Sequence, residues 1–582
     1  MSRGFPRSLA FVLVVLYAIA GCAAAFAQAG GATPPPPTPA TAPPSLPSPA
    51  TEASAASAPP SAAAGTPAVS APVASPSGSA TLATPTASAV PTLPPTPPPI
   101  IVEPPSAGVV PGGTEVLRVQ SVLGSISVTI ADPSIVDAAI DQIARTITIT
   151  GKQLGTTTLT VRDDRGVTRD VPVRVADLAG TIADSVTIRL TGDPATTYFL
   201  QEQALEAAVQ AAQPRAGAQI TATADSVIVD HPLQIDDTTT IDVPIIISGD
   251  DFFTVQGTTH VHVENVALPP IRPAYLMVSD FPETLTADGL LFEADLTPAQ
   301  PARFLYYHFN PAGQPDRRIV LRLRNTSSQP ANVQFISGMA GPEVNDMEVG
   351  HLSTERFLVR ESNNEGAVVT IPPNTTSAII AQPLPAQNID SNLVQLREID
   401  GAPLHLTLVA QDASDPIDGP LADSALLVGA VPHARGVYPV PEFYFDYQYD
   451  TSGPDLEVPI GQIPIPELKE GEALAGDYGV LQSITVRIVN PDPHNAAYVA
   501  CYASPRGGRA TGTFIIDGVL LQAHALPPFG HYELREYTIP PGGFIRTTIV
   551  TMPEGGSSYP LQLIFAPDDG STSPGAPNSL IY

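Results

Sequence analysis

One short pattern occurs twice in the C-terminal half of the chain and constrains the fold more than any other feature. The segments 319–325 and 484–490 both end in aliphatic, Arg, aliphatic, any residue, Asn, and turn-forming residues follow each Asn. Further along each copy, Thr-Ile-Pro-Pro recurs at 370–373 and 538–541 and leads into another apolar stretch. Such spaced self-similarity indicates a duplicated module. Because its apolar residues alternate with polar ones, we expect the module to be an antiparallel β-sandwich.

The rest of the chain follows the same β-rich plan. Long helical patterns are scarce, and 67 Pro and 44 Gly residues separate short alternating segments, which is typical of β proteins with many turns. We predict a mainly β protein with several tandem Ig-like β-sandwich domains and one small α+β domain after a disordered linker. The expected boundaries are 1–27 (signal peptide), 28–108 (Pro/Ala/Ser/Thr-rich linker), 109–177 (small sandwich), 180–280 (α+β or Ig-like domain with one helix), 283–430 (sandwich) and 436–582 (a repeat of the preceding sandwich).

The N-terminus has the plan of an export signal. Two arginines precede an apolar stretch, 9–20, that is too short to span a membrane comfortably. Two interpretations of its processing remain open. Ala-Phe-Ala at 25–27 fits ordinary cleavage, whereas Ile-Ala-Gly-Cys at 19–22 resembles the lipobox of bacterial lipoproteins, which implies a lipid on Cys22. Either one predicts a periplasmic, cell-surface or secreted protein, with membrane contact only through that lipid.

The segment 32–106 consists almost wholly of Pro, Ala, Ser and Thr. It lacks the apolar side chains that would offset the entropy of ordering, and its prolines favour extended polyproline II. At roughly 3.1 Å per residue, a linker of this length would extend to about 200 Å. We therefore predict a stalk that holds the folded domains away from an anchor.

The sandwich predicted at 109–177 contains four motifs in order: Asp-Pro-Ser-Ile-Val-Asp at 132–137, Ile-Thr-Ile-Thr-Gly-Lys at 147–152, Gly-Thr-Thr-Thr-Leu at 155–159 and Asp-Arg-Gly at 164–166. In these motifs it resembles the pilus-formation N-terminal domain found before secretins of tight-adherence pilus systems, and more loosely a bacterial Ig-like group 2 domain. The resemblance implies an envelope or surface β module without catalytic residues, and it does not imply a pore. The C-terminal half resembles the generic Ig-like modules of exported bacterial proteins.

A candidate metal site lies on the strand predicted at 260–266. Side chains on a strand alternate between its faces, so Thr258, His260, His262 and Glu264 share one face. Two imidazoles and a carboxylate are suitable ligands for a transition metal. The alternative interpretation is the solvated face of a half-buried strand. No cofactor is predicted elsewhere.

Two further groups of residues have a functional and a structural interpretation. The aromatic segments 306–308 and 443–449 would stack on a sugar if exposed, or fill the sandwich cores if buried. Four aspartates between 412 and 423 would surround a calcium ion or form an acidic linker. Both interpretations remain open in each case.

Charge and motifs narrow the function classes. With 27 Lys and Arg against 57 Asp and Glu, a net charge of −30 disfavours nucleic-acid partners. No serine-hydrolase elbow, zinc-protease, phosphate-loop or dinucleotide motif occurs, so we do not expect an enzyme. The sequence favours an exported, structural or adhesive cell-envelope protein that presents binding surfaces on a Pro-rich stalk to a cell-wall polymer or another surface protein. Alternatives are an accessory component of a pilus or secretion system, a carbohydrate-binding surface protein, and a hydrolase assembled across modules.

Overall fold

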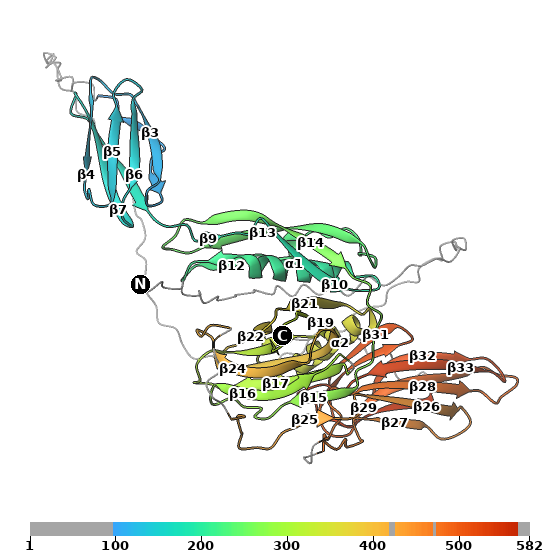
Figure 1. Cartoon of the computed structure of the whole chain (residues 1–582). Coiled ribbons are helices and arrows are strands. Elements are labelled where there is room, and N and C mark those ends of the chain that lie inside the picture. The colour runs from blue at the N-terminus through green and yellow to red at the C-terminus, as the bar shows by residue number, and fades with distance from the viewer. Residues whose placement is uncertain (1–96, 299, 418, 420–424, 469–472, 569–582) are drawn as a thin grey trace, which may run out of the picture. The chain divides into compact units, whose positions relative to one another are not determined.

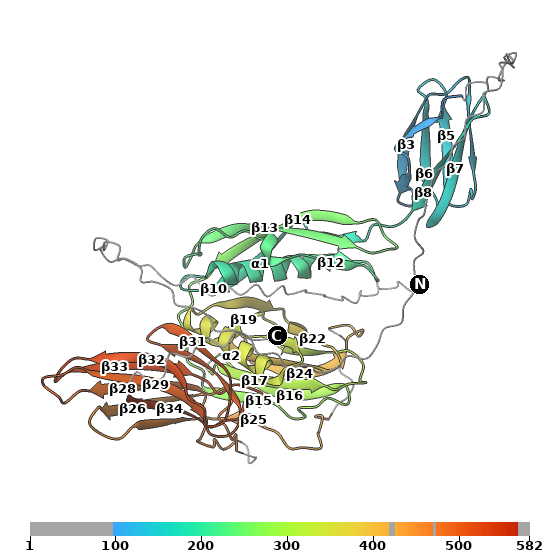
Figure 2. The same ribbon diagram turned by 180° about the vertical axis from the view of Figure 1, so that it is seen from behind.

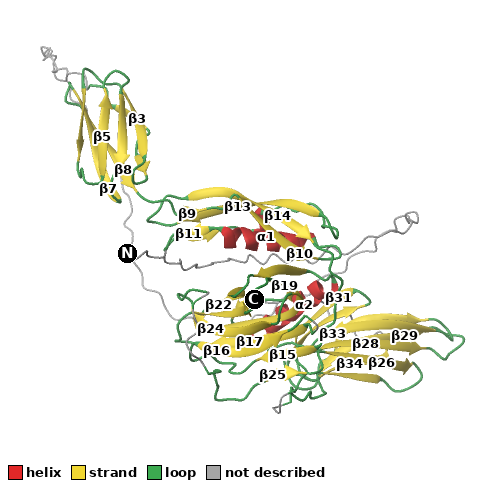
Figure 3. Cartoon of the chain, viewed as in Figure 1, coloured by secondary structure: helices red, strands yellow, loops and turns green. Residues whose placement is uncertain are grey.

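The computed structural model describes residues 97–568 except 299, 418, 420–424 and 469–472. Among these residues strands predominate, and the α-helices are α1 (Thr197–Ala211) and α2 (Asp346–Ser362) (Figures 1, 2 and 3). The expectation of a mainly β protein is therefore confirmed. The predicted signal peptide, Cys22 and most of the predicted linker lie outside the described residues.

Residues 100–176 form a sandwich of two four-stranded sheets. Burial follows the alternation of the sequence, because Ile147 and Ile149 are fully buried while the threonines beside them are half-exposed. Leu159 of the facing sheet joins the same core. In one sheet the strand order is β1 (Ile101–Glu103), β3 (Thr114–Gln120), β6 (Thr146–Gly151), β5 (Val136–Asp141). In the other it is β2 (Ala107–Val109), β8 (Thr168–Val175), β7 (Gly155–Asp163), β4 (Ile126–Ile130).

This sandwich begins earlier than predicted. The strands β1 and β2 lie inside the segment 28–108 that was expected to be linker, and Val102 and Ala107 are buried in the core. Each is a three-residue strand at a sheet edge, the position at which neighbouring prolines are tolerated. The Pro-rich composition therefore concealed two short strands.

Residues 178–266 form an α+β unit in which α1 packs on one face of four strands (Figure 1). The side-chain oxygen of Thr196 caps the helix by accepting the N–H of Phe199 at 3.3 Å. The single helix that was expected in this domain is present. The strand order is β12 (Gln219–Thr221), β13 (Thr238–Ser248), β14 (Val255–Asn265), β10 (Ser185–Thr191).

The next unit is a sandwich whose larger sheet is continuous with the α+β unit, because β10 also pairs with β21. Leu321 and Leu406 from one sheet and Phe304 and Val394 from the other lie in its core. The sheets run β21 (Gly366–Ile371), β19 (Ala331–Ser337), β23 (Asn388–Asp400), β17 (Ala302–Asn310), β15 (Tyr275–Ser279), β25 (Arg435–Tyr438) and β16 (Gly289–Leu296), β24 (Leu404–Asp412), β18 (Arg317–Asn325), β22 (Thr375–Leu384), with β20 (Ala340–Glu343) on β23.

The helix α2 in this unit was not predicted. Its buried face includes the polar residues His351, Ser353 and Thr354. Apolar residues at helical spacing are the main sequence signal for a helix, and polar residues on the buried face weaken that signal. Tertiary contacts satisfy those polar side chains, and the sequence of the helix does not reveal such contacts.

The last unit, residues 442–567, is a second large sandwich. Ile484 and Val486 of β28 pack against Val499 and Phe565 of the facing sheet. The sheets run β26 (Glu442–Asp450), β28 (Leu481–Val489), β33 (Phe544–Thr551), β30 (Ala510–Ile516), β31 (Val519–Leu526) and β27 (Leu456–Ile460), β34 (Leu561–Pro567), β29 (Ala497–Pro505), β32 (Tyr532–Ile539).

The repeated segments lie in matching positions. The side-chain amide of Asn325 donates to the carbonyl of Ile371 at 3.1 Å, and that of Asn490 donates to Ile539 at 3.3 Å, both isoleucines belonging to Ile-Pro-Pro. In each copy the strand ending at Asn pairs with the strand that follows Ile-Pro-Pro. The copies differ in the insertion before Ile-Pro-Pro, which is β20 and α2 in one and β30 and β31 in the other.

Candidate functional site

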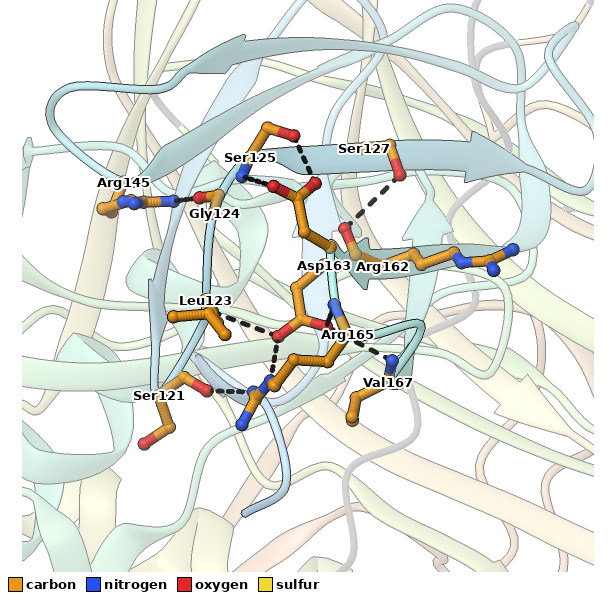
Figure 4. Close-up of polar contacts among 11 residues, drawn as sticks. Ser121, Leu123, Gly124, Ser125, Ser127, Arg145, Arg162, Asp163, Arg165 and Val167 are labelled. Carbon is orange, nitrogen blue, oxygen red and sulfur yellow. Dashed lines mark hydrogen bonds and ion pairs between the residues drawn. The ribbon is translucent and has the colours of Figure 1, made fainter. Parts of the chain in front are cut away.

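Three loops meet at one end of the first sandwich. They connect β3 to β4 (121–125), β5 to β6 (142–145) and β7 to β8 (164–167). The pairs Asp141↔Thr146 and Arg162↔Thr168 close the two hairpins at this end. We call these loops, with Asp163 at the end of β7, the loop cluster (Figure 4).

Asp163 is the centre of the loop cluster. Its carboxylate is almost fully buried and accepts the backbone N–H groups of Leu123 at 3.1 Å, Arg165 at 3.0 Å and Val167 at 3.2 Å. The guanidinium of Arg165 pairs with the same carboxylate at 2.6 Å. Burial would raise the pKa of Asp163, but these hydrogen bonds and the Arg165 charge lower it overall. The group therefore remains an anion that organises the backbone around it.

The neighbouring residue ties a second loop to the cluster. Asp164 accepts the backbone N–H of Ser125 at 3.0 Å and its hydroxyl at 2.6 Å, and these bonds lower the pKa of Asp164. Gly124 has a φ of +74°, and a Cβ atom there would lie 1.8 Å from Asp164 Oδ2. Glycine is required at this position by both conformation and space.

Two arginines complete the network through backbone carbonyls. Arg145 Nη1 donates to the carbonyl of Gly124 at 2.5 Å, which joins the β5–β6 loop to the β3–β4 loop. Arg165 Nη2 donates to the carbonyl of Ser121 at 2.6 Å (Figure 4). All three loops are therefore fixed by side chains rather than by strand pairing.

The rigid loops present apolar side chains to solvent. Leu123 is 61% exposed and Ile143 is 98% exposed. Asp141 Oδ1 accepts the N–H groups of Ile143 and Ala144, each at 2.9 Å, which fixes the turn that carries Ile143. An arrangement of this kind is suited to contacting a partner, because exposed loops on a rigid scaffold commonly carry recognition.

The chain enters this sandwich at the loop cluster and leaves it at the other end. Ile101, at the start of β1, pairs with Gln120, which directly precedes the β3–β4 loop. Val175, at the end of β8, pairs with Gly155 at the start of β7, far along that strand from the cluster. The described chain therefore enters the sandwich at the end that carries Leu123 and Ile143.

The predicted metal ligands His260, His262 and Glu264 share the exposed face of β14, as the alternation indicated. His260 Nδ1 lies 2.7 Å from Asp242 Oδ1, and His262 Nδ1 lies 2.9 Å from the hydroxyl of Thr240. Both partners are on β13. In the described ranges no group of three or more His, Cys, Asp or Glu side chains is placed to hold a metal ion.

The aromatic segments are mostly core. Tyr306 and His308 are fully buried, and the Tyr306 hydroxyl donates to Gln382 Oε1 at 3.0 Å. Phe445 and Tyr447 pack against the core of the last sandwich, whereas Tyr444 is 53% exposed on the other face. A sugar-stacking platform at these two segments is therefore not supported.

The aspartates proposed for calcium are only partly described. Asp412 accepts the backbone N–H and hydroxyl of Ser414 at 2.8 and 2.6 Å, so it closes a turn. Asp418 and Asp423 lie outside the described residues.

Sequence reasoning found part of the loop cluster and missed the rest. The Asp-Arg-Gly motif at 164–166 was singled out by the resemblance. Leu123 and Ile143 carry no sequence signal, because exposed apolar residues are common on protein surfaces. A group made of the buried His351 and Glu554 and the half-buried His524 was also missed, since its members come from distant segments.

Comparisons with known proteins add the following. No curated protein matches the chain. Similar solved structures include the fibronectin(III)-like modules of Clostridium thermocellum CbhA, with 12% identity, 30% of this chain and 98% of that chain covered, and a TM-score of 0.15. Mouse cadherin-23 EC22-24 has 15% identity, with 29% of this chain and 65% of that chain covered and a TM-score of 0.12. The human desmocollin-1 ectodomain has 10% identity, with 31% of this chain and 43% of that chain covered and a TM-score of 0.12. These similarities carry no argument about function.

One further property concerns membranes. Neither of the described helices, α1 and α2, has the length and apolar composition of a membrane-spanning segment.

A family model matches the first sandwich of the chain. Residues 104–176 match the family described as pilus formation protein N terminal region. The sandwich that bears the loop cluster is therefore the part of the chain that matches a pilus-formation N-terminal domain.

Proposed function

We propose that the protein is a non-enzymatic structural component of the cell envelope that acts with a pilus or secretion apparatus. The observation that carries the proposal is the match of residues 104–176 to the pilus formation protein N terminal region. The domain covers a small part of the chain, and the remaining units are β-sandwich and α+β modules suited to presenting surfaces. Export places such a protein where these partners are found.

The chemistry of the loop cluster supports contact rather than catalysis. Asp163 and Asp164 have lowered pKa values because hydrogen bonds stabilise their anions. A general acid or base for work near neutral pH needs a pKa close to that pH, and these carboxyls are displaced away from it. Hydrogen bonds to Asp163 and to Asp141 instead hold Leu123 and Ile143, respectively, in fixed positions.

The path of the chain supports a spacer function for the same domain. The stalk side and the module side of the sandwich are opposite ends of the strands. The nine residues of β7 correspond to about 30 Å along the strand. The domain would therefore add this length between the segment that precedes it in the chain and the modules that follow it.

Affinity purification from envelope fractions tests the proposal. The full-length protein would be compared with a Leu123→Asp, Ile143→Asp double variant and with Leu154→Asp as the matched control. Leu154 is 60% exposed in the β6–β7 turn, at the other end of the same sandwich. We expect pilus or secretion components to co-purify with the wild type and the control, and to be reduced at least tenfold with the double variant, as the loss of two buried apolar contacts would produce.

Two outcomes would contradict the proposal. One is recovery of no pilus or secretion component from cells that assemble such an apparatus. The other is equal loss with the control, which would place the contact away from the loop cluster. Enzyme activity of the purified full-length protein toward envelope polymers would overturn the non-enzymatic assignment.

A further inference from the structure

The helix α2 joins the two large sandwiches. It belongs to the insertion of the earlier of these two large sandwiches, and His351 on its buried face is 0% exposed. The elements of the last sandwich opposite His351 are β30, β31 and the segment after β33. The unlike insertions of the two copies therefore meet at this helix.

A buried ion pair lies at this contact. His351 Nδ1 is 2.9 Å from Glu554 Oε2, and both side chains are 0% exposed. The hydroxyl of Thr511 also donates to Glu554 Oε2, and the hydroxyl of Thr513 lies 3.4 Å from His351 Nδ1. Glu554 is thus held by groups from both sandwiches. Removing either charge would leave the other buried without its partner, which is costly.

A second imidazole lies against the first. The rings of His351 and His524 of β31 are 4.5 Å apart between centroids and meet edge to face at 70°. His351 Nε2, His524 Nδ1 and Glu554 Oε1 are buried and have no hydrogen-bond partner. These side chains do not form a metal cluster, since the described residues contain none.

The surroundings set different charge states for the two histidines. Burial alone would lower the pKa of His351, but Glu554 beside it raises the value overall, with Glu348 and Glu355 acting in the same direction. Burial lowers the pKa of His524, and the positive charge of His351 lowers it further. The contact therefore favours the charged form of His351 and the neutral form of His524.

We propose that His351, Glu554 and His524 form an acid-sensitive latch between α2 and the C-terminal sandwich, closed near neutral pH and opened when His524 takes up a proton. A proton on His524, which is half-buried with its Nδ1 inside the contact, places a second imidazolium ring edge to face against the fully buried His351. The two like charges repel, because the protein side of the contact screens them less than water does.

The sign of the pH dependence follows from both histidines. The neutral form of His524 is favoured in the folded protein, so its contribution is lost as pH falls from its ordinary value of about 6.5 through its lowered pKa. The charged form of His351 is favoured, so its contribution is lost as pH rises through its raised pKa. The latch is strongest between these two values.

Carboxyls that face His351 from its own helix modify the response. Burial raises the pKa values of Glu348 and Glu355, so both take up protons earlier than usual on acidification. When Glu348 and Glu355 take up protons, the free-energy cost of burying their charges disappears. The negative charge that stabilised the nearby imidazolium rings disappears as well. Arg356 lies near Glu355, and no basic residue other than the histidines is required for the effect.

Hydrogen exchange of the full-length protein at about pH 7 and about pH 5 tests the latch. After correction for the intrinsic pH dependence of exchange, we expect amides of α2 and β30 to exchange at least tenfold faster at the lower pH in the wild type. His524→Gln removes the titrating group and should abolish that acid response. His351→Gln should weaken protection at both pH values. Peptides from β18 and β24, in the core of the sandwich that carries α2, report whether each variant is folded.

His405→Gln is the matched control, because His405 lies between Glu293 and Asp295 at 3.4 and 2.9 Å on a partly exposed face of the same unit. It should retain the wild-type acid response. Equal protection of α2 at both pH values in the wild type would overturn the proposal. So would an unchanged acid response in a folded His524→Gln protein.

Discussion

Arg303 Nη2 lies 3.1 Å from Glu442 Oε1, and the Arg303 side chain is completely buried between the two large sandwiches. The same guanidinium donates to the carbonyl of Pro441 at 2.7 Å. Arg303 is the second residue of β17 in one sandwich, and Glu442 is the first residue of β26 in the next. The contact between these units is thus made by a charge that has no access to solvent.

Replacing Arg303 by Met should destabilise this contact by about 3–5 kcal/mol, because Glu442 would lose its buried partner and keep only the exposed Arg272, 4.0 Å away, and the Tyr444 hydroxyl. Urea unfolding of the full chain, followed in the transition of the two sandwiches, measures the change. The double variant Arg303→Met, Glu442→Met should recover part of the loss. Arg487→Met is the control, since that arginine bonds Gln448 at an exposed site, and its cost should stay below about 1 kcal/mol. Equal costs for the two arginines would refute the account.

Asn325 and Asn490 should be equally important to their units. Each amide is almost fully buried and satisfies backbone carbonyls at the turn, so truncation to Ala leaves those carbonyls unpaired at a cost of about 1–3 kcal/mol. Denaturant unfolding of Asn325→Ala and Asn490→Ala gives the two values. Asn332→Ala, which removes a bond to Asp400 at a partly exposed site, is the control and should cost less. Strongly unequal losses would argue against equivalent environments.

Gly124→Ala should disrupt the loop cluster, because the new Cβ would collide with the Asp164 carboxylate. Gly112 is a matched control in the same sandwich, with a φ of +78° and no atom within 4 Å of a Cβ. Backbone strain alone costs about 1–2 kcal/mol, so Gly112→Ala should lose about that much and Gly124→Ala more. Thermal unfolding, with hydrogen exchange of residues 121–125, distinguishes the two. Indistinguishable variants would show that the Asp164 contact is unimportant.

The lowered pKa of Asp163 predicts a specific acid response. Its anion contributes stability that is present above the unfolded pKa of about 3.9 and is lost as pH falls through the lower folded value. Asp163→Asn should therefore be less stable than the wild type at neutral pH, and the difference should shrink at strongly acidic pH. Unfolding of the first sandwich measured across pH provides the comparison. A difference that stays constant with pH would contradict the assignment.

Intact-mass analysis of the protein from cell fractions decides between the two export interpretations. A lipid-modified N-terminus at Cys22 should place the protein in the membrane fraction, and Cys22→Ser should release it. Ordinary cleavage should leave a free N-terminus at Gln28 and no effect of that substitution. An intact Met1 in the cytoplasm would exclude export.

Local sequence rules were sufficient for much of the fold. Alternation predicted the strands of the first sandwich, and the spaced Asn and Ile-Pro-Pro motifs predicted two related units, because pleating and turn chemistry act over a few residues. The same rules failed at β1 and β2, where prolines hid buried residues, and at α2, where polar residues occupy the buried face. For the loop cluster, the sequence indicated Asp164 and Gly166 but not the exposed Leu123 and Ile143.

By itself the sequence determined the β-rich class, the duplicated module and the pilus-type motifs of the first sandwich. Tertiary structure alone decided which buried charges meet. His351 and Glu554 are 203 residues apart in sequence yet 2.9 Å apart in space. Side-chain periodicity is a local property of one strand or helix. The pairing of distant buried charges depends on how those elements pack, because only packing removes the water that would otherwise solvate them.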